Sequence, residues 1–295
     1  ATLEKHKELC RKNLLATTMY TLPKDNMLEF EDYGKTVTPP FTLFADFEAL
    51  LPSDVKYHQI HKPIAAGCLL INNYTGEAEY EVFVGNDCVK SFLGYIDTLV
   101  ETKVLKFIKE EMPTPMEILP PNIHLEFVNT RTCYLCKKKK ISLVRDHCHY
   151  SGKYLGAACP KCNLSRKIRK LLPVVFHNLR GYDMHHILKY GLSEFKHWTI
   201  SCIPNTQEKF TSLFANTKGV SIRFIDSYAF VDTSLKLAVK NLTSTPITDM
   251  LMDNSSIVSS KGIFPYDFVT SLEILQETTE LPPIWSGISE SDYEV

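Results

Sequence analysis

The chain has 295 residues, 44% of them hydrophobic and 23% charged, with a net charge of −1. This balance is typical of a globular protein with a substantial core, and it excludes whole-chain disorder and collagen-like structure. No apolar run has the length of a membrane span, and the polar start does not resemble a signal peptide. The composition therefore predicts an intracellular protein that is not secreted and has no membrane partner.

Residues 1–35 are expected to form a peripheral segment that ends at a proline-rich break. Within it, His6 and Cys10 have the spacing of half a zinc finger, but ordinary surface side chains are the simpler interpretation. Three apolar, β-rich stretches then predict strands over 40–51, 62–73 and 78–85.

Two acids, Asp46 and Glu48, occur within the first of these strands. Because side chains at i and i+2 of a strand share one face, both carboxylates are expected to project together. Burying such a pair is costly unless a cation balances the charge. Alone, the pair is at least as well explained by a solvated surface.

The remaining pattern predicts an α/β body that is interrupted by a small insert. A long amphipathic helix is expected over 87–112. After the insert, the sequence predicts strands over 171–179, 199–203, 209–215 and 220–226, with helices over 183–191 and 233–242. The predicted organisation is an N-terminal segment 1–35, a body in two parts, 36–130 and 171–295, and the insert 131–170, called the cysteine module below.

Four of the nine cysteines form two Cys-x2-Cys pairs inside the cysteine module. Each pair can turn two thiolates toward one ion, and two pairs complete the tetrahedral site that zinc prefers. The residues are Cys133, Cys136, Cys159 and Cys162. A structural zinc site explains this spacing better than a redox pair or a secreted disulfide framework.

The cysteine module also contains twelve Lys and Arg side chains against a single acid. A basic island in an otherwise acidic chain is typical of a surface that contacts phosphates. We therefore expect the run Lys137, Lys138, Lys139 and Lys140 to bind DNA.

Polar residues between and after the cysteine pairs resemble the ββα-metal (His-Me finger) nucleases of the phage endonuclease VII type. The counterparts are Asp146, His147, His149 and Asn163. The resemblance implies that His147 deprotonates a water and that Asp146 and Asn163 hold a hard cation. Cys148 stands where the phage version commonly has an acid. DNA cleavage and DNA binding alone both remain open for this module.

A second body motif, FHNLRGYD, runs from a strand end into a helix and contains Asn178, Tyr182 and Asp183. Strand ends commonly place functional groups, and Asp183 adds a third carboxylate to Asp46 and Glu48. With the earlier Asp-x-Glu, this order resembles the first two exonuclease motifs of family B DNA polymerases, and most closely the protein-primed branch of phages, adenovirus-like viruses and Polinton/Maverick-type transposons.

That resemblance implies an RNase H-like (DnaQ-like) 3′–5′ exonuclease body with an inserted zinc module. Asp46, Glu48 and Asp183 would bind two Mg²⁺ or Mn²⁺ ions. Asn178, Tyr182, Ser227 and Tyr228 would hold a single-stranded primer terminus, and Lys261 and Tyr266 would position the scissile phosphate. The partners would be DNA and a terminal priming protein, in a nucleus or at a viral or mobile-element replication site.

A fourth carboxylate is missing from this set. Tyr228 and Asp232 have the spacing of the third exonuclease motif, but they fall where the primer-binding segment is expected. No polymerase palm motif is present, so the sequence predicts a fragment that cannot polymerise and has little or no exonuclease activity alone. The alternatives are a structure-selective endonuclease acting through His147 and a DNA-binding remnant without catalysis.

Overall fold

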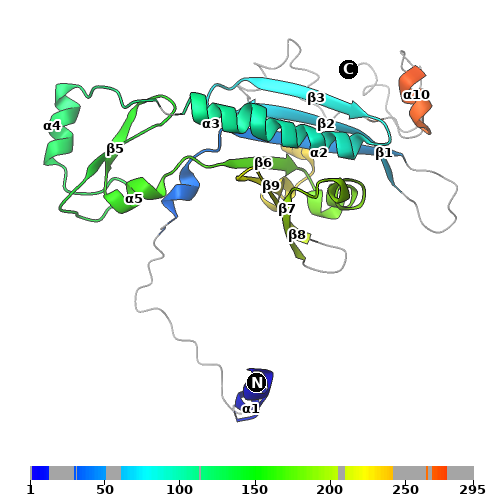
Figure 1. Ribbon diagram of the computed structural model, residues 1–295, viewed down its shortest axis with the longest axis horizontal. Helices are drawn as coiled ribbons and strands as arrows, with labels where there is room; N and C mark the ends of the chain where they lie inside the picture. Colours follow the sequence, from blue (N-terminus) through cyan, green and yellow to red (C-terminus); the bar gives the residue numbers. More distant parts are fainter. Residues whose placement is uncertain are drawn as a thin grey trace.

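The computed structural model describes residues 2–12, 30, 32–50, 61–112, 114–204, 210–241, 264 and 268–277. Its main body is a seven-stranded mixed sheet in the order β3-β2-β1-β6-β9-β8-β7 (Figure 1). The strands are β1 Phe41–Leu50, β2 Lys62–Asn72, β3 Ala78–Val84, β6 Leu171–Phe176, β7 Thr199–Pro204, β8 Phe210–Thr217 and β9 Val220–Asp226. All seven strands expected from the sequence for this body are confirmed.

The directions of the strands bring three carboxyl ends together at one edge of the sheet. β1 pairs with β2, and β2 with β3, in antiparallel fashion. β6 runs parallel to β1, and β9 runs parallel to β6. The carboxyl ends of β1, β6 and β9 therefore meet at the same edge, where α/β proteins commonly bind ligands.

One long helical segment covers a face of the sheet (Figure 1). α2, Cys88–Leu99, continues through a π-helical turn, η2, Val100–Leu105, into α3, Lys106–Glu110. This confirms the amphipathic helix expected over 87–112. From β1, the ring of Phe47 packs edge-on against Phe92 at 5.4 Å, and Phe41 packs against Phe107 at 5.4 Å. Since strand side chains alternate, Asp46 and Glu48 project from the opposite face of β1.

The segment after β6 winds into short helices beside α2. They are η3 Leu179–Gly181, α6 Asp183–His186, η4 Ile187–Gly191 and η5 Leu192–Glu194. A β-carbon added at Gly191 would lie 2.4 Å from Leu93 Cδ1, so glycine allows this segment to contact α2 closely. Beyond β9 follow η6 Ser227–Ala229, α7 Leu235–Lys240 and α10 Leu272–Glu277. The helix expected over 233–242 is thereby confirmed.

The cysteine module forms a separate two-stranded sheet at one end of the body (Figure 1). β4, Val144–His147, pairs antiparallel with β5, Tyr154–Ala158, and α5, Pro160–Ser165, follows. The short helix η1, Tyr33–Thr36, contacts α5. α4, Pro121–Asn129, packs Phe127 beneath the guanidinium of Arg145, 5.2 Å from the ring centre.

Three α-helices of the described residues were not expected from the sequence. They are α1, Thr2–Lys12, which carries His6 and Cys10, then α4, and α10. Within the described ranges, no helix combines the length and the apolar character that crossing a lipid bilayer requires.

Candidate functional site

Three acids gather at the carboxyl edge formed by β1 and β6. Asp46 and Glu48 lie on the second half of β1, just past the last residue of that strand paired with β6. Asp183 is the first residue of α6, in the segment that follows β6. Asp46 is exposed, Glu48 is half-buried, and Asp183 is only 2% exposed.

The charges of these acids influence one another. Burial first, and then the negative charges of Asp46 and, more weakly, Glu48, raise the pKa of Asp183 from 3.8 to about 8, against opposing backbone hydrogen bonds. Oδ1 of Asp183 is buried and has no hydrogen-bond partner. An unsatisfied buried carboxylate oxygen beside two like charges suits a hard divalent cation, which prefers oxygen ligands and would relieve the repulsion.

Aromatic and imidazole groups surround Asp183. The hydroxyl of Tyr182 lies 2.8 Å from Nδ1 of His61, a residue just before β2. Burial first, then the charges of Asp183, Glu48 and Asp46, raise the pKa of Tyr182 to about 12, so its hydroxyl is protonated and can donate. His186 is buried with Nε2 unsatisfied, and burial lowers its pKa to about 4, which keeps it neutral. His61 and His186 were not identified from the sequence.

A buried aspartate at the end of β9 holds the FHNLRGYD loop in place. Oδ1 of Asp226 accepts from the backbone N–H groups of Asn178 at 2.9 Å and Tyr228 at 3.0 Å. Its Oδ2 accepts from the backbone N–H of Arg180 at 3.1 Å. Asn178 has a positive φ of 66°, and its side chain fills the space beside Gly181, where an added β-carbon would lie 2.5 Å from Asn178 Oδ1. Asp226 therefore fixes the turn that delivers Tyr182 and Asp183.

The residues expected to hold a primer end have contacts within the protein. Ser227 Oγ donates to the carbonyl of Phe176 at 3.0 Å and also lies 3.0 Å from Nδ1 of His177. Tyr228 is 42% exposed, and its hydroxyl is hydrogen-bonded to Asp232. Lys261 and Tyr266 lie outside the described residues.

The four cysteines of the module form the expected cluster. Their sulfur atoms all lie within 4.8 Å of one another, whereas sulfurs around a tetrahedral zinc are about 3.8 Å apart for a Zn–S length of about 2.3 Å. Burial opposes ionisation of Cys133, but backbone N–H groups, including that of Cys159 at 3.2 Å, lower its pKa to about 7. Burial first, and then the neighbouring cysteines, raise the pKa of Cys162 to about 12. The preformed cluster of four sulfur atoms fits a structural zinc ion.

The acid of the second nuclease motif is held in a buried ion pair. Asp146 is 4% exposed, and its Oδ2 accepts from the hydroxyl of Tyr134 and from Nη1 of Arg166, both at 2.6 Å. The ring of Tyr134 lies over Gly156, where an added β-carbon would be only 2.7 Å away. Arg166 thus supplies at Asp146 the positive charge that a metal ion would bring.

The other residues of that motif lie around the same strand. The rings of His147 and His149 are 4.9 Å apart, and burial, then the neighbouring His147, lowers the pKa of His149. Asn163 is half-buried on α5, with its backbone N–H bonded to the carbonyl of Cys159. The chain order of two strands and a helix agrees with the expected ββα arrangement.

Replacing Asp146 by Ala should destabilise the cysteine module, because Arg166 would be left buried without a counter-charge. Breaking a buried pair in this way costs about 3–5 kcal/mol, measurable by urea unfolding of the zinc-loaded protein. Asp32→Ala is the control, since its ion pair with Lys35 is exposed and its loss should not be detectable. An unchanged unfolding curve for Asp146→Ala would contradict a structural role.

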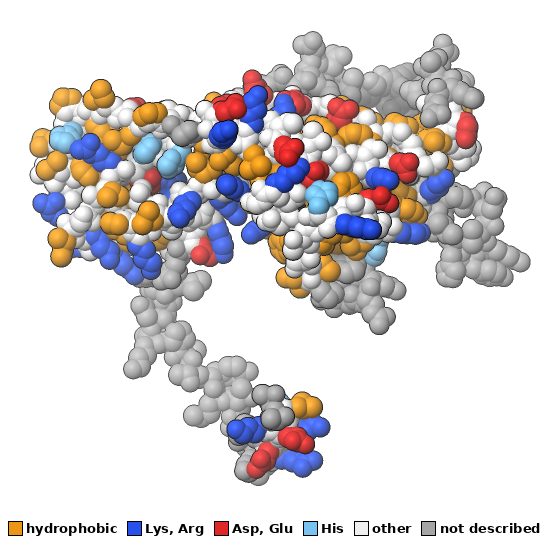
Figure 2. All heavy atoms as spheres, viewed as in Figure 1, with side chains coloured by type: hydrophobic (Ala, Val, Ile, Leu, Met, Phe, Trp, Pro, Cys, Tyr) orange, Lys and Arg blue, Asp and Glu red, His pale blue; other side chains and the backbone are white. Residues whose placement is uncertain are grey.

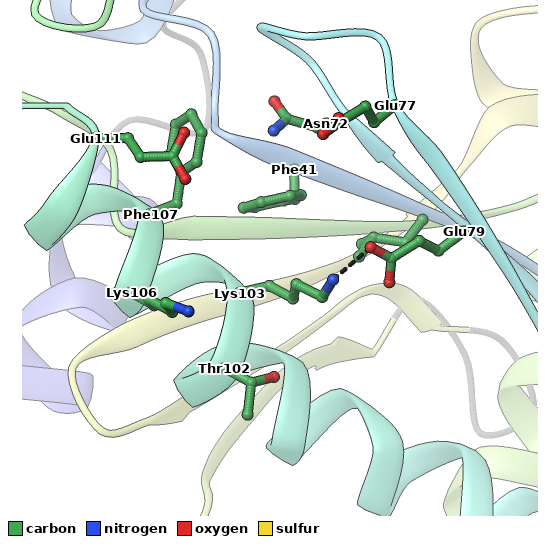
Figure 3. A pocket seen from close by; sticks show the side chains of 10 residues that line it. Phe41, Asn72, Glu77, Glu79, Thr102, Lys103, Lys106, Phe107 and Glu111 are labelled. Atoms are coloured by element: carbon green, nitrogen blue, oxygen red, sulfur yellow. Dashed lines mark hydrogen bonds and ion pairs between the residues drawn. The ribbon is translucent and has the colours of Figure 1, made fainter.

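A separate pocket of about 210 Å³ lies at the opposite end of β1 from the acids. Figure 3 shows Phe41 and Phe107 within it. Lys103 on η2 reaches toward Glu79 on β3, to which it is ion-paired. Two of the charged side chains of this pocket, Lys103 and Glu79, are already paired with each other. Phe41 is the first residue of β1, whereas Asp46 lies on the second half of that strand. This pocket is therefore not part of the carboxylate site.

The basic side chains expected to contact DNA are on the surface. Lys137, Lys138, Lys139 and Lys140 are all exposed. Figure 2 shows Lys and Arg side chains gathered along the lower edge of the cysteine module, at the left of the view. Their exposure leaves this edge accessible to a large anionic partner.

Comparison with known proteins gives one family match. The model of the family "DNA polymerase type B, organellar and viral" matches residues 165–284, less than half of the chain. The match includes the FHNLRGYD loop, Asp183 and Asp226, but neither Asp46 and Glu48 nor the four cysteines. No curated protein and no solved structure matches the chain. The matched segment points to a region of a type B DNA polymerase.

Proposed function

We propose that this chain is a 3′–5′ exonuclease region of a type B DNA polymerase, of the protein-primed kind. In this proposal Asp46, Glu48 and Asp183 bind two divalent cations, Mg²⁺ or Mn²⁺, at the carboxyl edge of the sheet. The observation that carries it is Asp183, a buried carboxylate with an unsatisfied oxygen and a pKa raised by burial and then by the charges of Asp46 and Glu48.

The strand order supports this proposal. Three antiparallel strands followed by two strands parallel to the first, in the spatial order β3-β2-β1-β6-β9, is the arrangement expected of an RNase H-like body. The family match supports it independently, because it covers the loop that carries Asp183. A similar fold does not by itself establish the reaction, so the proposal rests mainly on the cluster of Asp46, Glu48 and Asp183.

In the reaction, two divalent ions roughly 4 Å apart would supply an activated water and stabilise the leaving oxygen. The three carboxylates would hold those ions, while Tyr182, held by its hydrogen bond with Nδ1 of His61, would contact the strand end. Asn178 and the exposed Tyr228 would contact the unpaired end, since single-stranded ends can stack on aromatic rings. Lys261 and Tyr266 would hold the scissile phosphate.

The cysteine module is proposed to hold DNA rather than to cut it. Asp146, which would hold a cation in a His-Me finger nuclease, is already paired with Arg166 and Tyr134. A structural zinc would fix the loops, and the exposed lysines would contact phosphates. This reading favours exonuclease chemistry in the body over endonuclease chemistry at His147.

A single-stranded oligonucleotide labelled at its 5′ end tests the function. With only three acids in place, we expect slow shortening at most, so the main readout is Mn²⁺-dependent binding of the free 3′ end. Asp46→Ala should abolish both the Mn²⁺-dependent binding and any shortening. Glu77→Gln, which changes an exposed acid at the β2–β3 turn, should leave both unchanged.

Plasmid nicking separates the alternatives. Nicking that survives Asp46→Ala but disappears with His147→Ala would contradict the proposal and favour an endonuclease. If salt weakens DNA binding and Mn²⁺ has no effect on it, the result would favour a DNA-binding protein without catalysis.

A further inference from the structure

A second pocket, of about 200 Å³, lies where η1 meets the cysteine module. Three segments that are distant in sequence contribute its walls. Phe30 and Tyr33 come from the segment at η1, Lys138 and Lys140 from the loop after the first cysteine pair, and Lys161 and Ser165 from α5. Three of the zinc-site cysteines also line it, so the pocket lies directly beside the sulfur cluster.

Specific packing holds these walls together. Tyr33 packs against the cysteine cluster, which fixes η1 on the module. A β-carbon added at the neighbouring Gly34 would lie 2.4 Å from the carbonyl oxygen of Ser165, so only glycine permits this approach. The guanidinium of Arg169 also donates to the carbonyl of Lys35, at 3.4 Å. The pocket is therefore built into the fold.

The chemistry of the lining is basic and aromatic. Apart from the three cysteines, lysines supply all of its charged side chains among the described residues, and Lys140 and Lys161 are exposed at its rim. Phe30 is 54% exposed although it is a large aromatic residue, and its ring meets that of Tyr33 edge-to-face at 5.5 Å. An exposed aromatic ring beside ammonium groups is the combination that binds single-stranded nucleic acid, through base stacking and phosphate contacts.

We propose that this pocket binds one nucleotide of single-stranded DNA. Its base lies against Phe30 and Tyr33, and the flanking phosphates contact Lys140 and Lys161 on the rim, away from the sulfur atoms. A paired base cannot enter, so the pocket selects single strands. The inference rests on the proposed function only in taking DNA as the partner; it does not require the carboxylates of the body.

The test uses the zinc-loaded full chain, a fluorescent twelve-residue oligo-dT and no Mg²⁺, with binding followed by anisotropy. Phe30→Ala should weaken binding about tenfold, the effect expected of losing one stacked base. Lys140→Ala should weaken binding severalfold and reduce the slope of log affinity against log salt by about 0.7. Lys139→Ala removes the same charge from the same run at a residue that does not line the pocket, so it should weaken binding clearly less than Lys140→Ala.

An oligonucleotide of the same length without bases separates stacking from simple charge attraction. It should bind more weakly than oligo-dT, and Phe30→Ala should not weaken it further. If Lys139→Ala costs as much as Lys140→Ala and Phe30→Ala costs nothing, the pocket proposal is overturned while DNA remains the partner. If the wild-type chain does not bind single-stranded DNA without divalent metal, the pocket proposal is overturned, whereas the proposed function is decided separately by Mn²⁺-dependent binding of the 3′ end.

Discussion

Asp183→Asn is expected to abolish divalent-cation binding at the carboxylate edge and, without metal, to make the protein more stable at pH 8. The folded pKa of Asp183 is about 8, against 3.8 for the free group, so the folded chain retains a proton that the unfolded chain releases. The free energy of unfolding is therefore highest below pH 4. It falls as the pH rises from about 4 to about 8, by up to about 1.4 kcal/mol per pH unit. Asparagine carries no charge and avoids this loss.

Thermal unfolding at pH 5 and pH 8, with and without Mn²⁺, measures this effect. The wild type should lose stability between the two pH values, and Mn²⁺ should restore it. Asp183→Asn should show neither the pH dependence nor the response to Mn²⁺. The control is Glu77→Gln, an exposed acid outside the site whose change should leave both properties as in the wild type. If the wild type is equally stable at both pH values, the raised pKa of the buried Asp183 is contradicted.

Loss of one cysteine ligand should have the second large effect. Cys159→Ser is expected to remove the bound zinc and unfold the cysteine module, because structural zinc sites contribute about 10–16 kcal/mol of apparent binding free energy. The seven-stranded sheet has its own hydrophobic core and should remain folded. Native mass spectrometry reports the zinc, and hydrogen exchange of β4, β5 and α5 reports the folding of the module.

The matched control for this prediction is Cys148→Ser. Cys148 lies in the same module but is not one of the four clustered cysteines, so this variant should retain one zinc per chain. Zinc lost from Cys148→Ser and retained by Cys159→Ser would show that the ligand set is misassigned.

Sequence patterns predicted the parts of the fold whose signals are local. Alternation in β1 placed Asp46 and Glu48 on one face, opposite the core residue Phe47, and helical periodicity predicted the segment over 87–112. The two cysteine pairs predicted their own cluster through spacing alone. Each of these signals lies within a few residues of chain or in a short repeated motif.

Contacts between distant segments were not predictable in this way. The hydrogen bond between His61 and Tyr182 joins residues 121 positions apart, and no local pattern marks either as a partner. Arg166 is one of the twelve basic residues interpreted as a DNA surface, yet its side chain is only 17% exposed and is paired with the buried Asp146. Charge counting cannot separate an internal ion pair from a solvated run.

The missed helix α4 had a usable signal. Pro121 is its first residue, a favoured position because proline lacks only an N–H that has no partner there. The helix has nine residues and no buried side chain, so its hydrophobic periodicity was too weak to predict it.

The central claim is that acids from β1 and α6 share one cation site. Iron-directed backbone cleavage tests it most directly: Fe²⁺ replaces Mg²⁺, ascorbate and peroxide generate local radicals, and mass spectrometry locates the cuts. We expect cuts near residues 46–48 and near Asp183, suppressed by excess Mg²⁺. Cuts confined to residues 146–163, or cuts that excess Mg²⁺ does not suppress, would contradict a shared site in the body.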